Sequence, residues 1–582
     1  RRQILAGGAA RSCPRPRFPR SPPMRPLLAA LVALLAVPIA GRVVPAAAEE
    51  NGRLQVKLLA INDFHGNLKP PPGGIALRDP ADPKKTVQVA AGGSEAMATL
   101  VKEKRAKAKN SVFVAAGDLV GASPLLSALF ADEPTIEALS AMGLEVSAVG
   151  NHEFDKGASE LLRKQNGGCQ SDKSCLALHP FLGAKFQYLA ASTIDTATGK
   201  TLLPPYAIKT FEGISIGFVG LTLKGTPGVV SPSGVVGLEF RDEAETVNAL
   251  VPELKAKGVE AIVVLIHEGG FPTGGYDECP GISGPIVGIV GRLDPAVDVV
   301  VSGHTHAAYN CVIAGRLVTS GDKFGTIVTE IDLEIDRASR DVVSAKAANV
   351  IVRTDTYAKD TDQTALIAAY ERVAAPLIDK PIGRITATIG KSATTAGEMP
   401  IGDLVADGQL AATRTADKGG ATLALTNTGG IRTDLVATAE GVVTYGAIFA
   451  VQPFSNQLVT QTLSGAELHR VLEEQWLDQP KPRILQVSQG FTYRWDAGKP
   501  VGSRVEPASM RLDGRPIDPA ADYRVTINAF LADGGDGFTT LAKGRDKVTG
   551  IYDVEALEAH VAALSKAGPV VPPTVGRIER GE

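Results

Sequence analysis

Short apolar runs alternate with amphipathic stretches through the first half of the chain. The runs are "LQVKLLAI", "SVFVAAG", "VSAVG", "ISIGFVGL", "AIVVLIH" and "VDVVVSG", and segments such as "SEAMATLVKEKRAKA" separate several of them. Apolar runs bounded by glycine predict strands, and helical periodicity between them is typical of α/β layering. We therefore expect an α/β domain over residues 54–352.

A second pattern begins near residue 380. The segment "TDQTALIAAYERVAAPLI", 361–378, has helical periodicity, so we expect a linker helix within residues 353–380. Further strand patterns, "ATLALTNTG" and "YRVTINAFL", and a helical one, "AELHRVLEEQW", predict a second domain over residues 381–578. Two domains also agree with a length of 582 residues, which exceeds what one core usually organises.

Residues 1–48 have the pattern of a signal and processing segment. Residues 1–23 carry six arginines and no acid, and are interpreted either as translated upstream sequence or as an extended n-region. The apolar stretch "PLLAALVALLAVPIA" follows, and "AAAEE" offers a small-residue cleavage site after Ala48. The stretch is shorter than the roughly 20 residues of a spanning helix. We expect a secreted or periplasmic protein with no stable membrane anchor.

Export would place the cysteines in an oxidising compartment. Loss of Cys13 with the leader leaves an even number: Cys169, Cys175, Cys279 and Cys311. We predict a Cys169–Cys175 pair, which closes the loop "CQSDKSC", and a Cys279–Cys311 pair. A zinc site built from all four thiolates is the alternative, although no CxxC spacing favours it.

Composition indicates a soluble globular protein. Apolar residues make up 44% and charged residues 21% of the chain. A formal net charge of -3 argues against a dominant surface for nucleic-acid polymers or anionic membranes. Nothing in the pattern indicates an oligomeric state.

Residues that bind metals follow five of the predicted strands. These stretches are "NDFHG" with Asp63 and His65, "GDLVG" with Asp118, "NHEFD" with Asn151, His152 and Asp155, "HEGG" with His267, and "GHTH" with His304 and His306. In open α/β sheets, ligands bind beyond the carboxyl ends of the strands. A single Asp or His is more often a helix cap or a core residue, but agreement at five strand ends favours a metal site.

The donor types also suggest how many ions bind. Asp, His and Asn without thiolate suit zinc, manganese, iron or magnesium. The donors are too many for one tetrahedral ion, and a carboxylate can bridge two ions in the arrangement used for phosphoryl transfer.

The order D-x-H, GD, GNHE, an isolated His and GHxH resembles the calcineurin-like metallophosphatases. With "INDFHGN", "GNHEFD" and a second domain, the chain resembles the secreted 5′-nucleotidase and UDP-sugar hydrolase family. The resemblance implies a four-layer αββα sandwich followed by a smaller α/β (α+β) nucleotide-binding domain. It also implies rotation of the second domain about the linker helix, with a hinge near residues 355–380.

The resemblance implies two divalent ions (Zn, Mn, Co or Mg) that share Asp118. The first would be held by Asp63, His65, Asp118 and His306. The second would be held by Asp118, Asn151, His267 and His304. His152 would stabilise charge on the phosphoryl group or protonate the leaving oxygen, and Asp155 would orient its ring. The remaining candidates are interpreted as structural or ordinary side chains: Glu153, Glu268, His179, His469 and His560.

The second domain would provide specificity. Considered separately, its "TNTGGIR", "QPFSNQL" and "AFLADGGDGF" stretches could hold only core Phe and turn Asp residues. The resemblance implies instead that Phe454 and Phe530 sandwich the base and that Arg432 contacts the phosphate. It assigns Asn427 to the base edge and Asp536 to the ribose hydroxyls. Gly430 lies in the glycine turn of "TNTGGIR", where the backbone can approach a ligand closely.

One position departs from the family pattern. Thr395, in "TTAGEMPIGDL", stands at or near a position where many relatives carry an arginine. We expect either that Arg414 substitutes for it or that the phosphate is held less tightly.

The resulting hypothesis is an exported, dimetal 5′-nucleotidase whose partner is a nucleotide substrate. UDP-sugars and nucleoside di- and triphosphates are further candidate substrates. The alternatives are a 2′,3′-cyclic-nucleotide 2′-phosphodiesterase/3′-nucleotidase and, from another class, a nucleotide-binding surface protein without catalysis. The intact ligand set argues against the second alternative.

Overall fold

The computed structural model describes residues 52–79, 82, 85–169, 179–230, 234–454, 456–479 and 481–581. The predicted leader, residues 1–48, lies outside these ranges. Within them, every helix is too short or too polar to cross a bilayer.

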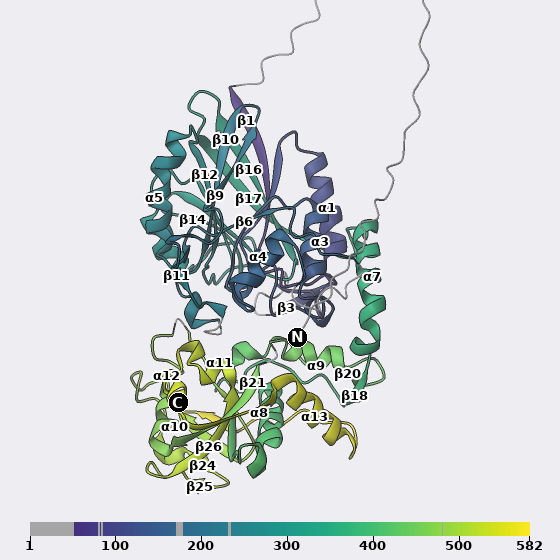
Figure 1. Cartoon of the computed structure of the whole chain (residues 1–582), viewed down its shortest axis with the longest axis vertical. Helices are drawn as coiled ribbons and strands as arrows, with labels where there is room; N and C mark the ends of the chain where they lie inside the picture. The colour runs from purple at the N-terminus through teal and green to yellow at the C-terminus, as the bar shows by residue number, and fades with distance from the viewer. Residues whose placement is uncertain are drawn as a thin grey trace, which may run out of the picture. The chain divides into compact units, whose positions relative to one another are not determined.

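Two six-stranded sheets form the centre of the first domain (Figure 1). The first sheet has the order β17 (Val342–Ile351), β16 (Ile327–Asp336), β1 (Arg53–Ile61), β4 (Ser111–Ala115), β5 (Val146–Ala148), β6 (Gln187–Leu189). The second has the order β14 (Ala308–Ile313), β15 (Arg316–Gly321), β13 (Val299–Ser302), β12 (Ala261–His267), β10 (Ile214–Thr222), β9 (Tyr206–Phe211). In each sheet the central strands run parallel, so their carboxyl ends share one edge.

Helices cover the outer faces of both sheets. They are α1 (Ser94–Ala106), α2 (Leu125–Ala128), α3 (Glu133–Met142), α4 (Ala158–Asn166), α5 (Glu243–Ala256) and α6 (Pro285–Arg292). Short strands complete the domain: β2 (Ile75–Arg78), β3 (Thr86–Val89), β7 (Thr193–Asp195), β8 (Lys200–Thr201) and β11 (Leu238–Phe240).

The side-chain alternation of β1 shows how the layers arise. Leu58 lies in the core between the two sheets, where it is joined by Phe218 of β10. Leu59, on the opposite face, lies in the core that includes α1 and α3. A third core joins the outer face of the second sheet to α5 and α6. Because successive strand residues point to opposite faces, these cores define four layers, and the predicted αββα sandwich is confirmed.

The predicted linker helix is α7 (Thr361–Ile378). Asp360 caps its first turn by accepting hydrogen bonds from the N–H groups of Asp362 and Gln363. The helix packs on the first domain, where Tyr370 is buried and donates a hydrogen bond to Glu137. The hinge near residues 355–380 stays a prediction.

The second domain is a mixed α/β unit, as predicted. Its main sheet has the order β22 (Gln486–Val487), β19 (Leu423–Thr426), β26 (Asp522–Asn528), β21 (Gln457–Ser464), β27 (Arg545–Tyr552). Smaller sheets contain β25 (Arg515–Pro516), β24 (Arg511–Leu512), β23 (Phe491–Trp495) and β28 (Ile578–Arg580), and β18 (Pro381–Arg384) with β20 (Val442–Thr444). The helices are α8 (Pro400–Thr413), α9 (Tyr445–Val451), α10 (Gly465–Glu473), α11 (Ala529–Ala532), α12 (Thr539–Ala542) and α13 (Asp553–Ser565).

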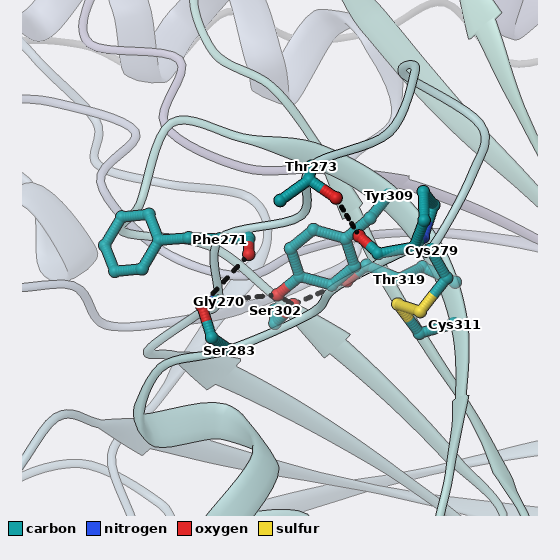
Figure 2. The surroundings of a disulfide bond; sticks show 10 residues. Gly270, Phe271, Thr273, Cys279, Ser283, Ser302, Tyr309, Cys311 and Thr319 are labelled. Carbon is teal, nitrogen blue, oxygen red and sulfur yellow. Dashed lines mark hydrogen bonds between the residues drawn. A yellow bond between two sulfur atoms is a disulfide. The ribbon is translucent and has the colours of Figure 1, made fainter.

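A disulfide joins Cys279 to Cys311, with their Cα atoms 5.1 Å apart (Figure 2). This predicted pair is confirmed, and the alternative of a zinc site made by all four thiolates is wrong because these two sulfurs are bonded to each other. The predicted Cys169–Cys175 pair involves Cys175, which lies outside the described residues. The Cys279–Cys311 bond links the loop after β12 to β14.

Candidate metal centre

The predicted metal-binding residues gather at the carboxyl ends of β1, β4, β5, β12 and β13. Among the described residues they form three overlapping groups in which the ligand atoms lie within 4.8 Å of one another. The groups are Asp63–His65–His306, His65–Asp118–His152 and Asp118–His267–His304. Asp118 and His65 each belong to two groups, so the cluster is continuous.

The backbone at these positions is strained. The left-handed φ angles are 50° at Asp63, 46° at His65, 49° at Asp118, 69° at His304 and 53° at His306. Such angles are uncommon for residues other than glycine and persist only where the surrounding structure enforces them. Because these angles cost free energy and occur together in one cluster, they indicate that the rest of the fold enforces them and thereby orients these side chains.

Asp118 is the central carboxylate of the cluster. Its Oδ2 atom lies 2.9 Å from Nε2 of His267 and 3.7 Å from Nε2 of His65. Burial alone would raise the pKa of Asp118, but the facing His267 and His152 hold it well below its usual range. The pKa of Asp63 is likewise lowered against the effect of burial, chiefly by His306. Both carboxylates are therefore anionic despite complete burial.

The imidazole rings are oriented by backbone carbonyls. Nδ1 of His65 lies 2.8 Å from the Gly121 carbonyl oxygen, and Nδ1 of His267 lies 2.7 Å from that of Ala116. If these nitrogens donate to the carbonyls, Nε2 of each ring presents a lone pair to the cluster, as in many metal sites.

Two buried atoms support the fit to cations. Nε2 of His267 makes no hydrogen bond despite its close approach to Asp118, and Oδ1 of Asn151 has no partner among the described residues. Buried polar atoms normally have partners. Aspartate, histidine and asparagine donors suit divalent ions such as zinc or manganese, so the residues fit a pair of ions.

Glu153 holds the loops that carry the cluster. Its carboxylate accepts hydrogen bonds from the N–H groups of Gly150 at 2.6 Å, Leu119 at 2.8 Å and Asp118 at 3.0 Å. It thereby ties the loop after β4 to the loop after β5, which agrees with its interpretation as structural. Gly150 permits this approach, because a Cβ atom there would lie 2.1 Å from Oδ1 of Asp118.

His152 lies over the cluster. Its backbone N–H donates to Oδ1 of Asp118 at 2.9 Å, and its ring Nδ1 is 2.9 Å from Oδ2 of Asp155. Burial lowers the pKa of His152, but the negative charges of Asp155 and Asp118 outweigh it and raise the pKa. His152 lines a cavity together with Asp155 and Phe454.

Phe454 and Arg432 of the second domain lie beside this histidine. The rings of Phe454 and His152 stack with centroids 5.6 Å apart and planes 18° apart. The Arg432 guanidinium carbon is 5.6 Å from the Phe454 centroid. Burial lowers the pKa of Arg432, while Asp118, Asp155 and Asp63 oppose that shift. A cation and an aromatic face therefore accompany the Asp/His cluster.

Other predicted substrate residues gather around Asp536. Its carboxylate accepts a hydrogen bond from Nδ2 of Asn427 at 2.7 Å and pairs with Arg483. Gly430 follows β19 in the same turn as Asn427. Phe530 lies against Gly535, and among the ring contacts of the described residues none joins it to Phe454.

Sequence reasoning missed two cations, Arg483 and Lys391. The Lys391 ammonium donates to the carbonyl oxygens of Ile431 at 2.7 Å and Arg432 at 3.4 Å. Burial, and then the charge of Arg432, lower the pKa of Lys391 to about 7. Arg414, the expected substitute for the missing family arginine, is exposed at the end of α8. No local motif marked Lys391 or Arg483.

Comparisons with known proteins agree with this geometry. Residues 56–308 match the calcineurin-like phosphoesterase family, and residues 381–543 match the 5′-nucleotidase C-terminal domain. The sandwich fold, the buried Asp/His clusters and these matches define a metal-dependent phosphoesterase.

Comparisons with individual proteins identify the family within the class of metal-dependent phosphoesterases. The chain is 33% identical over 535 residues to endonuclease YhcR of Bacillus subtilis, covering 90% of this chain but only 41% of that protein. It is 30% identical over 578 residues to cell wall protein Lmo0130 of Listeria monocytogenes, covering 94% and 71%. A 5′-nucleotidase precursor from Thermus thermophilus has 27% identity and a TM-score of 0.73, with 90% and 99% covered. The chain belongs to the 5′-nucleotidase family.

Proposed function

We propose that this chain is an exported 5′-nucleotidase that hydrolyses nucleoside 5′-monophosphates to nucleoside and phosphate. The observation that carries the proposal is the placement of Arg432 and Phe454 against His152 and the buried Asp/His cluster. A 5′-nucleotide needs these elements together: a cation for the phosphate, an aromatic face for the base and a hydrolytic centre.

The clusters support two sets of metal-holding residues. One ion would be held by Asp63, His65, Asp118 and His306. The other would be held by Asp118, His267 and His304, together with Asn151, whose amide lies outside the three Asp/His groups. When bound, two divalent ions supply an activated water and neutralise charge on the phosphate.

Protein side chains would complete the reaction. His152, oriented by Asp155, gives a proton from Nε2 to the leaving 5′ oxygen, a contribution of about 10²–10⁴ in rate. Arg432 holds the phosphate, and Phe454 with Phe530 holds the base. Asn427 and Asp536 bind the base edge and the ribose, which requires substrate hydroxyls to replace part of the contact between Asp536 and Arg483.

Several features support export. The Cys279–Cys311 disulfide suits an oxidising compartment, and one relative is named a cell wall protein. The proposal includes a secreted or periplasmic location and a small nucleotide as partner.

Phosphate release from a substrate panel tests the proposal. The panel contains AMP, 2′,3′-cyclic AMP, UDP-glucose and ATP, each assayed with Mn²⁺, Zn²⁺, Co²⁺ or Mg²⁺ and with chelator. We expect AMP hydrolysis that chelator abolishes. Activity restricted to 2′,3′-cyclic AMP would establish the phosphodiesterase alternative, and AMP binding without turnover in every metal would establish the non-catalytic one.

A further inference from the structure

A large cavity lies beside the Asp/His cluster. Its volume is about 1050 Å³, and its wall includes Gly66 and Ala307, which directly follow His65 and His306 in the chain. A smaller cavity of about 650 Å³ contains His152, Asp155 and Phe454. Both cavities share Ala122 and Ser123. Two hollows therefore meet next to the cluster, whereas the proposed nucleotide contacts of Phe454 belong to the smaller one.

Part of the wall of the large cavity is formed by a loop, residues 269–283, that is held closed by contacts near its two ends. Its two ends pair through Phe271 and Ser283, and the Gly270 N–H donates to the Tyr309 hydroxyl at 3.2 Å. The Cys279–Cys311 disulfide ties this loop to β14. Figure 2 shows the Phe271 ring pointing away from Tyr309 and from the disulfide. The loop thus has a fixed base and presents an aromatic side chain that lines the cavity.

Another part of the cavity wall contains Lys323 and Phe324. The Phe324 ring meets His65 and His306 edge-on, with centroids 5.9 Å and 5.8 Å apart. Its φ of 58° is rare for a bulky residue, and its N–H donates to the Asp63 carbonyl at 2.7 Å. The Lys323 ammonium lies 5.3 Å from the centroid of the same ring. Strain of this kind points to a functional position for the ring and its neighbouring cation.

We propose that the large cavity is a second nucleoside subsite, so that the enzyme also cleaves phosphodiesters that carry a nucleoside on each side of phosphorus. A monoester would reach this cavity only with its terminal phosphate, at Arg432, and would leave the rest of it unfilled. The volume matches a typical ligand pocket of about 300–1000 Å³. Phe271 and Tyr276 offer rings for a base, and Lys323 offers charge for the phosphate. This inference rests on the proposed 5′-nucleotide orientation at Phe454.

The reaction balances as a hydrolysis. A water oxygen bonds to phosphorus, the bond between phosphorus and the 5′ oxygen breaks, and that oxygen gains a proton. A 3′,5′-dinucleoside monophosphate would therefore release the nucleoside that was esterified through its 5′ oxygen, and the group in the large cavity would leave as a nucleoside 3′-monophosphate. The products reveal which group occupied which cavity.

Adenylyl-3′,5′-adenosine and AMP provide the test. We expect the wild type to convert the dinucleotide to adenosine and 3′-AMP, measured by chromatography. Phe271→Ala and Tyr276→Ala should each lower kcat/KM for the dinucleotide about tenfold, the effect of losing one stacked base, and leave AMP turnover unchanged. Val312→Ala is the control, because Val312 is exposed on the same disulfide-linked strand and does not line the cavity.

The outcomes separate this inference from the proposed function. AMP hydrolysis without dinucleotide hydrolysis would overturn the second subsite alone. So would dinucleotide breakdown to adenosine and phosphate without 3′-AMP, which is the result of releasing 5′-AMP and then hydrolysing it, and so would equal dinucleotide rates in all variants. Absence of AMP hydrolysis in the wild type would overturn the proposed function. Thermal melting verifies folding, and Tyr276→Ala decides the question if Phe271→Ala fails to fold.

Discussion

Both domains bury carboxylates, but they keep them in different states. In the first domain, Asp63 and Asp118 are anionic because histidines face them. In the second, burial raises the pKa of Asp403 to about 8, although Arg577 opposes the shift, with its Nε atom 3.6 Å away. Burial therefore does not by itself identify a metal site. What distinguishes the first domain is a set of histidine rings that face each carboxylate.

The largest expected effect comes from removing the shared carboxylate. Asp118→Ala should abolish metal binding and phosphate release almost completely, because Asp118 belongs to two of the three groups. Metal content by mass spectrometry and AMP turnover measure this. Asp298→Asn, a half-buried carboxyl at the other end of β13, is the matched control and should retain both. Full metal content in Asp118→Ala would show that the ions bind elsewhere.

The next effect should come from the loop-holding carboxylate. Glu153→Gln replaces one acceptor oxygen by an amide that faces backbone N–H donors, so the loop with Asp118 loses its support. We expect metal affinity to fall about 10–100-fold, as for other residues that orient ligands. Calorimetric titration with Mn²⁺ measures this. Glu268→Gln, beside His267, is the control, and equal affinity losses in both variants would contradict a specific role for Glu153.

Asp155→Asn should have a smaller effect on turnover, with a defined pH signature. Asp155 raises the pKa of His152, so its removal lowers that pKa and the proton donor is lost at lower pH. We expect kcat to fall about tenfold and the alkaline limb of the profile to move to lower pH. An unchanged limb would mean that His152 is not the proton donor.

The contrast between the two domains also explains which features of the fold and of the site could be predicted from the sequence. The metal-binding residues follow strands and most stand beside glycines, so topology alone places Asp63 and Asp118 at one edge of the first sheet and His267 at the carboxyl end of a strand in the second. The extents of β12 and α7 also agree with the apolar run and the periodic segment. The ion pair between Asp536 and Arg483 joins residues that are 53 positions apart in the sequence. No strand pattern specifies such a contact. Lys391 was missed for the same reason.

The smallest effect concerns the neutral carboxyl of the second domain. With a pKa of about 8 in the fold against the ordinary aspartate value of 3.8, Asp403 binds a proton that the unfolded chain has already released. Stability should therefore fall as pH rises from the unfolded value towards the folded one. Asp403→Asn removes this ionisation. Between about pH 5 and pH 8 the wild type should therefore lose roughly 1–3 kcal/mol more stability than the variant. Denaturant unfolding at both pH values measures the difference, with the exposed Asp533→Asn as control. Equal pH slopes in wild type and Asp403→Asn would mean that Asp403 is anionic in the fold, and the contrast between the two domains would not hold.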